Sequence, residues 1–95
     1  MFVRYQQVAS SAAVKNQSNL TIPGAATHAM LQAETQDIRY TMDNATTPTS
    51  TVGMLLKAGL APEQFLIEDL RRIHFTQAAG GAGLLNIHYF CGGIQ

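Results

Sequence analysis

The sequence predicts an all-β fold, a small antiparallel β-sandwich or jelly-roll-like barrel of seven or eight short strands with at most one helical turn. Apolar and polar residues alternate with a period of two, and turn residues recur about every eight to twelve positions. No segment keeps an apolar stripe at helical spacing for three turns. A chain of 95 residues has room for one core, so residues 1–95 are expected to form a single domain.

The first half of the chain contains four segments with strand character. Residues 2–7 alternate and open the fold, and residues 20–22 run into a Pro-Gly turn pair. Residues 28–34 and 37–42 each place their apolar side chains on one face. Because the link at 35–36 has only two residues, we expect these last two strands to form a hairpin.

A long polar loop separates this half from the second. Within residues 43–52, Pro48 bars a central strand, and Asp43 and Asn44 can cap a turn with their side chains. Residues 68–72 begin with acidic and end with basic side chains, which suits the single helical turn. The further strands are expected at residues 54–56, 62–67, 73–77 and 85–91.

Charge in this chain is low and balanced, which argues against nucleic acid as a partner. Six Lys and Arg residues face six Asp and Glu residues, charged residues make up 13 %, and the cations are scattered rather than clustered. No apolar run approaches the roughly 20 residues of a membrane helix, and the first residues lack the apolar stretch of a signal peptide. We therefore expect no membrane partner, folding in a cytoplasm, and a surface suited to being covered by other proteins.

The candidate catalytic and ligand residues form no recognisable site. His74 and His88 fall on strands expected to be adjacent and could hold a metal as a pair, as in a small metal-dependent enzyme, but no third ligand is evident. Asp43 and Asn44 resemble a fragment of a calcium loop, although capping of a turn is the simpler interpretation. The one cysteine, Cys91, excludes an internal disulfide, and strand geometry would point it away from His88. We expect an inert buried thiol and no catalytic, metal-binding or cofactor-binding residues.

Aromatic residues near the two ends are the strongest candidates for contacts with other molecules. A terminal strand that is apolar on both faces is usually covered on both, so we expect the strand at 1–9 and the tail at 90–95 to lie in subunit contacts. The loop between the halves offers a second surface. The candidate contact residues are Phe2, Tyr5, Phe90 and Ile94 near the ends, and Thr47, Pro48 and Thr49 in the loop.

Several segments together carry a resemblance to a known group of proteins. Their residues run Leu-Gln-Ala-Glu, Asp-Ile-Arg-Tyr-Thr-Met-Asp, Thr-Pro-Thr, Val-Gly-Met-Leu-Leu-Lys-Ala-Gly and Leu-Asn-Ile-His-Tyr, at positions 31–34, 37–43, 47–49, 52–59 and 85–89. The pattern resembles small virion structural proteins of tailed bacteriophages, of the head decoration or minor head type. Asn44, where that group has glycine, and the tail at 90–95 depart from it. The shorter stretch of residues 40–49 is also similar to a hairpin in the C-terminal sandwich domain of chitobiase-type enzymes.

The phage resemblance implies a non-enzymatic capsid decoration or cement protein, located in the virion after assembly in the cytoplasm of the bacterial host. Its partners would be the major capsid protein or other virion proteins, together with further copies of this chain as a homo-oligomer such as a trimer. A neck, tail, baseplate or fibre component is the alternative within the same class. A carbohydrate-binding adhesion module is a further alternative, against which the absence of Trp and the small number of Tyr residues argue.

Overall fold

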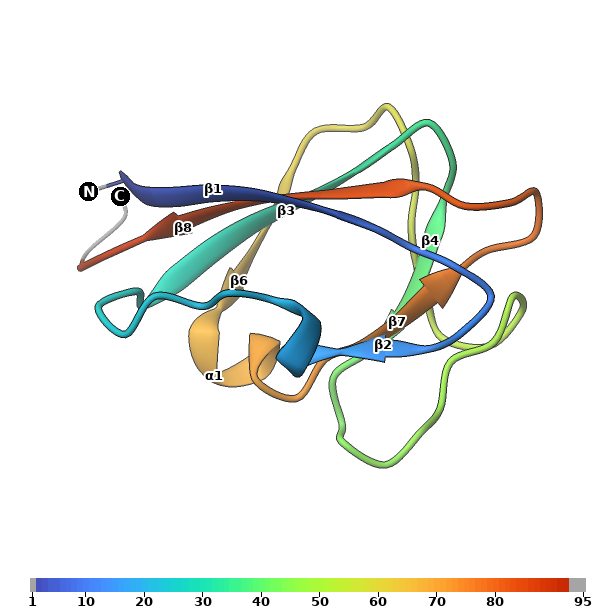
Figure 1. Cartoon of the computed structure of the whole chain (residues 1–95), viewed down its shortest axis with the longest axis horizontal. Helices are drawn as coiled ribbons and strands as arrows, with labels where there is room; N and C mark the ends of the chain where they lie inside the picture. The colour runs from blue at the N-terminus through green and yellow to red at the C-terminus, as the bar shows by residue number, and fades with distance from the viewer. Residues whose placement is uncertain (1, 93–95) are drawn as a thin grey trace.

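Two four-stranded sheets form the structure, a computed structural model that describes residues 2–92 (Figure 1). The elements in chain order are β1 (Phe2–Ala9), β2 (Lys15–Asn16), the 3-10 helix η1 (Gln17–Asn19), β3 (His28–Glu34), β4 (Ile38–Thr41), β5 (Met54–Leu56), β6 (Glu63–Leu66), α1 (Ile67–Leu70), β7 (His74–Gln77) and β8 (Leu84–Phe90). One sheet has the order β1-β8-β3-β6, and we call it the terminal sheet because it contains the first and last strands. The second sheet has the order β2-β7-β4-β5.

The strand order is that of a jelly roll. Every pair of neighbouring strands is antiparallel, and the chain changes sheet at each connection except that between β4 and β5, which pair with each other. Exchange of consecutive strands between two sheets is the property that separates a jelly roll from a simple stack of hairpins. The predicted all-β sandwich of seven or eight strands is therefore confirmed.

The core lies between the two sheets and follows the alternation of the strands. In β3, Ala29, Leu31 and Ala33 face inward, and in β8 every second residue does the same. The short helix α1 adds apolar side chains at one end of the sandwich. The largest fully buried hydrophobic side chains are Tyr89, Phe75, Leu31, Ile38, Leu70, Ile73, Leu85 and Ile87.

The predicted hairpin between residues 28–34 and 37–42 is wrong. β3 belongs to the terminal sheet and pairs with β8 and β6, whereas β4 belongs to the second sheet and pairs with β7 and β5. Thr35, with a φ of 73°, instead turns the chain through a corner. The physical reason is that both strands carry one apolar face, and a corner between sheets lets these two faces meet across the core.

Residues 10–19 contain structure that their polar composition hides. β2 is a two-residue strand paired with β7, and η1 follows it as a helical turn in addition to α1. Asn16 caps η1, because its side-chain oxygen accepts a hydrogen bond from the Ser18 amide at 2.9 Å. Asn19 in turn accepts a hydrogen bond from the Asn16 amide at 3.0 Å. Side-chain capping, rather than apolar periodicity, therefore fixes this segment.

Hydrogen bonds of the Gln6 side chain link β1 to the rest of the sandwich. Its Oε1 accepts hydrogen bonds from the Tyr89 hydroxyl at 2.9 Å and from the Thr21 amide at 3.0 Å. Burial raises the pKa of Tyr89 to about 12, against a smaller lowering by Arg4, so this hydroxyl keeps its proton and remains a donor. One amide thus joins the first strand, the last strand and the loop before β3.

A buried serine and a glycine close the junction between the start of β8 and the end of β1. The Ser10 hydroxyl donates to the Gly83 carbonyl at 2.9 Å and accepts from the Gly83 amide at 2.8 Å, while the Ser10 amide donates to the same carbonyl at 2.8 Å. A Cβ atom at Gly83 would overlap the backbone oxygen of Gln36. Glycine is required here because of this close backbone approach.

We predict that Gly83→Ala lowers the free energy of unfolding by about 2 kcal/mol or more, because the backbone of the corner must move to admit a methyl group. Gly24→Ala is the matched control, since nothing lies within 4 Å of the added atom. We expect the control to range from unchanged to stabilised by about 1 kcal/mol. Urea unfolding of both variants measures the difference, and equal stability of the two would contradict the close approach at Gly83.

Candidate interaction surface

The outward side of the terminal sheet collects the aromatic residues that the sequence marks near the two ends. Strand pairing arranges these residues in rows across the sheet. The first row is Phe2, Phe90, His28 and Leu66, the second is Tyr5, His88, Met30 and Gln64, and the third is Gln7, Asn86 and Gln32. We call these residues, together with Glu34, the outer face. The candidates Phe2, Tyr5 and Phe90 thus lie on one surface, opposite the core.

A β-bulge in β1 is what places Phe2 and Tyr5 on the same face. In a regular strand, residues three apart point to opposite sides. The register of β1 against β8 shifts between Phe2 and Arg4, so that Val3 is the extra residue and packs against the core. The bulge therefore restores Phe2 to the outer face, an effect that an extra residue in one strand of a pair produces.

His88 lies among three aromatic rings of the outer face. The ring centroid of His88 is 4.7 Å from that of Phe2, 5.2 Å from that of Tyr5 and 6.1 Å from that of Phe90. The rings of Phe2 and Phe90 also meet edge to face at 6.2 Å. Phe2 remains 52 % exposed and Tyr5 50 % exposed, so this cluster presents a large apolar area to its surroundings.

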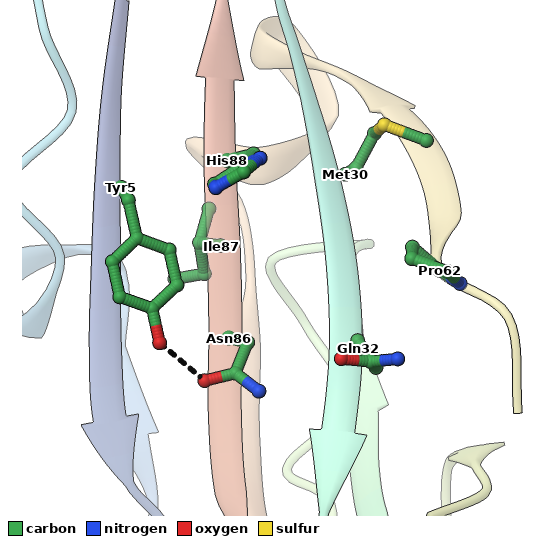
Figure 2. A pocket seen from close by; sticks show the side chains of 7 residues that line it. All are labelled: Tyr5, Met30, Gln32, Pro62, Asn86, Ile87 and His88. Carbon is green, nitrogen blue, oxygen red and sulfur yellow. Dashed lines mark hydrogen bonds between the residues drawn. The ribbon is translucent and has the colours of Figure 1, made fainter. Parts of the chain in front are cut away.

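A polar network borders the aromatic cluster on its other side. The Oδ1 atom of Asn86 accepts hydrogen bonds from the Tyr5 hydroxyl at 2.8 Å and from the Gln7 amide at 2.9 Å. The Asn86 amide donates to the Glu34 carboxylate at 2.9 Å. Figure 2 shows the Tyr5 hydroxyl directed at Asn86 on the neighbouring strand. The network fixes the orientation of the Tyr5 ring on an open surface.

A shallow hollow of about 170 Å³ lies beside this ring (Figure 2). It is lined by Tyr5, Met30, Gln32, Pro62, Asn86, Ile87 and His88. Gln32 is held in place because its amide donates to the Leu60 carbonyl at 3.2 Å. The hollow is larger than the roughly 150 Å³ cavity that takes a benzene ring, so it has room for one aromatic or aliphatic side chain of a partner.

The loop residues predicted as a second contact surface differ in their accessibility. Thr47 and Thr49 are exposed, but Pro48 is fully buried within the chain, so its side chain is not available to a partner. The loop folds back against the second sheet, where the Thr41 hydroxyl donates to the Thr46 carbonyl at 2.7 Å. The contact candidate Ile94 lies outside the described residues.

The expectation that Asp43 caps a turn is confirmed. Its carboxylate accepts hydrogen bonds from the backbone amides of Ala45 and Thr46 at 3.0 Å and 2.9 Å, and from the Thr46 hydroxyl at 2.6 Å. These bonds lower the pKa of Asp43 from 3.8 to about 2, and the bond from the Thr46 hydroxyl makes the largest contribution. The carboxylate is therefore committed to the turn.

The histidine pair proposed as a metal site is not brought together. β7 carries His74 in the second sheet and β8 carries His88 in the terminal sheet, so the expectation that they lie on adjacent strands is wrong. Within residues 2–92, no group of three His, Cys, Asp or Glu side chains is placed to hold a metal ion. Cys91, expected to be buried, is half-buried just beyond the end of β8.

None of the protein-family models, curated proteins or solved structures compared with this chain matches it. In the part of the chain that the structure describes, no helix has the length and apolar character needed to cross a membrane. The interpretation of the outer face therefore rests on its own chemistry.

The lowered pKa of Asp43 gives a prediction about acid. Because this pKa is depressed in the folded protein, the capping contribution is present above about pH 4 and is lost as the pH falls toward 2. An NMR titration of the carboxyl carbon should give a midpoint near 2 for Asp43. In Asp43→Asn, the NMR signal of the Thr46 backbone amide should no longer shift with pH in this range. A midpoint close to 3.8 for the wild-type carboxyl would contradict the cap.

We also predict that the double variant Phe2→Ser, Tyr5→Ser folds nearly as stably as the wild type. Both rings are half exposed, so the free energy of unfolding should fall by no more than about 1 kcal/mol for the pair. The double variant should also bind less of an apolar fluorescent dye than the wild type, because the exposed cluster is removed. A collapse of stability in urea unfolding would instead assign the two rings to the core.

Proposed function

We propose that this chain is a non-enzymatic structural protein of a tailed-phage virion, a capsid decoration or cement subunit that attaches through the outer face. The observation that carries the proposal is the exposed cluster of Phe2, Tyr5, His88 and Phe90 on an almost uncharged sheet face. Monomeric proteins rarely leave a continuous aromatic patch of this kind in water, so it is suited to being covered.

The resemblance in sequence fits the positions of its segments in the fold. Residues 31–34 and 85–89 belong to β3 and β8, the two central strands of the terminal sheet. Residues 37–43 include all of β4, and residues 52–59 include β5, which pairs with it. Jelly rolls are also frequent among viral capsid proteins, which supports the proposal at the level of the fold only.

The partners in this proposal are the major capsid protein, other virion proteins and further copies of this chain. Phe2, Tyr5 and Phe90 are the contact residues on the outer face, with Ile94 as a further candidate in the tail. Thr47 and Thr49 provide a second, smaller surface on the exposed side of the loop. An aromatic cluster with polar amides beside it, as on the outer face, is a usual composition of a protein interface.

Attachment to purified virions tests the proposal. We expect the wild-type chain to co-purify with virions, and Phe2→Ser, Tyr5→Ser to be lost from them at least tenfold while still folding. Met54→Ser is the matched control, because Met54 is 64 % exposed but lies on β5 of the second sheet. Absence of the chain from virions would refute the proposal. The copy number of a labelled chain distinguishes the capsid surface from the neck, tail or fibre.

A further inference from the structure

We propose that the outer face binds a second copy of this chain, with two terminal sheets stacked face to face about a two-fold axis that runs parallel to their strands. This inference rests on the proposed function only in taking the same face as the assembly surface. Among the partners proposed above, it takes a second copy of this chain as the molecule that covers the outer face, and it gives the dimer a defined geometry.

The distribution of charge favours a second copy as the occupant. Among the residues of the outer face, Glu34 is the one carboxylate, it is engaged by Asn86, and no Lys or Arg is present. Two such faces can therefore approach without the repulsion that like charges impose on self-association. A partner that binds through several charged side chains would find only Glu34 on this face, with Glu68 and Arg71 at its border beside His28 and Leu66.

The order of the rows selects the direction of the axis. Along the strands, the outer face changes from the aromatic row of Phe2 and Phe90 to the amide row of Gln7, Asn86 and Gln32. An axis parallel to the strands places the aromatic rows of one copy over those of the other, and the amide row over the amide row. The side-chain amides of the two copies can then donate and accept hydrogen bonds between them. An axis perpendicular to the strands would bury the amides against aromatic rings and leave their hydrogen bonds unmade.

The same axis determines which side chains of the two copies meet around the hollow. With the axis between β8 and β3, the two central strands, each copy lays Met30 over His88 of the other copy. Tyr5 of one copy then lies toward Gln64 of the other, on the side of the hollow that Met30 and Pro62 line. The hollows of the two copies then face each other across the axis, because β8 residues line each hollow on one side of it and β3 residues on the other.

The area available indicates a weak dimer. Three strands of about seven residues and β6 with four, at ~3.3 Å per residue and ~4.8 Å between strands, give about 400 Å² of flat area per copy. Two copies bury about 800 Å² on this flat estimate, somewhat below the ~1,000 Å² above which specific interfaces lie. The dimer is therefore expected to depend on concentration in solution and to be favoured where copies are held close together on a particle.

Sedimentation of the free protein up to about 1 mM at pH 8 tests the inference. We expect a shift from monomer to dimer in the wild type, at least tenfold weaker association for Met30→Glu and for His88→Lys, and wild-type association for Met54→Glu on the second sheet. An equal mixture of Met30→Glu and His88→Lys should associate again, because the introduced glutamate and lysine face each other in the mixed dimer. Circular dichroism verifies that each variant is folded.

Two outcomes overturn the inference. A wild-type chain that stays monomeric throughout leaves the face to another virion protein or to a saccharide, and a mixture that fails to associate refutes the direction of the axis. The proposed function is tested separately, because a chain can dimerise in solution and be absent from virions, or bind virions as a monomer. Recovery of association by the mixture together with loss in each single variant supports both the face and its geometry.

Discussion

The pairing of β8 between β1 and β3 is the constraint on which the rest of the structure depends. Both ladders run along nearly the whole of β8, and they fix the register of three of the four strands of the terminal sheet. Because side chains of a strand alternate, the register that buries Leu85, Ile87 and Tyr89 must also present Asn86, His88 and Phe90 on the opposite side. The core and the outer face are therefore two consequences of one pairing.

The two sheets differ in how their outer surfaces are treated. The loop after β4 folds back over the second sheet, where it buries Pro48 and brings the Gly53 carbonyl within 3.0 Å of the Arg39 guanidinium, which donates to it. The rows of the terminal sheet, in contrast, keep Phe2, Tyr5 and Leu66 about half exposed. The loop thus covers part of one surface, although Met54 on β5 stays exposed, whereas no loop covers the aromatic cluster on the other, which is the physical basis for placing the candidate interaction surface on the terminal sheet.

The sequence was sufficient to predict most strands, because one face of each is apolar and the period of two is read directly from residues such as Ile38 and Tyr40. It was insufficient for the partners of each strand. The same alternation suits a hairpin or a corner between sheets, so the link at Thr35 was interpreted wrongly and His74 was paired with His88. The segment at 10–19 was missed because hydrogen bonds of Asn16, rather than apolar residues, determine its conformation.

The candidate surface was predictable in its residues and not in its geometry. Aromatic residues that remain after a core is assigned are visible in any sequence, and Phe2, Tyr5 and Phe90 were found in that way. The rows that they form with His28, His88 and Met30 depend on the register. The position of Phe2 on the same face as Tyr5 depends on the bulge at Val3. Valine at position 3 is not a residue type that predicts a bulge. The network around Asn86 was likewise invisible, because it joins residues more than fifty positions apart.

The bulge in β1 also governs how the molecule can grow into larger assemblies. β1 is an edge strand of eight residues with a single charged side chain, Arg4, and an unbroken edge of this kind would template the addition of strand after strand from other copies. A break in register near its start kinks that edge and shortens the run available to such a copy. β8 has no free edge at all, because it is enclosed on both sides. In the proposed dimer, contact through the outer face would end with two molecules, whereas strand addition at the edge of β1 would continue into fibres, and the bulge disfavours the second route.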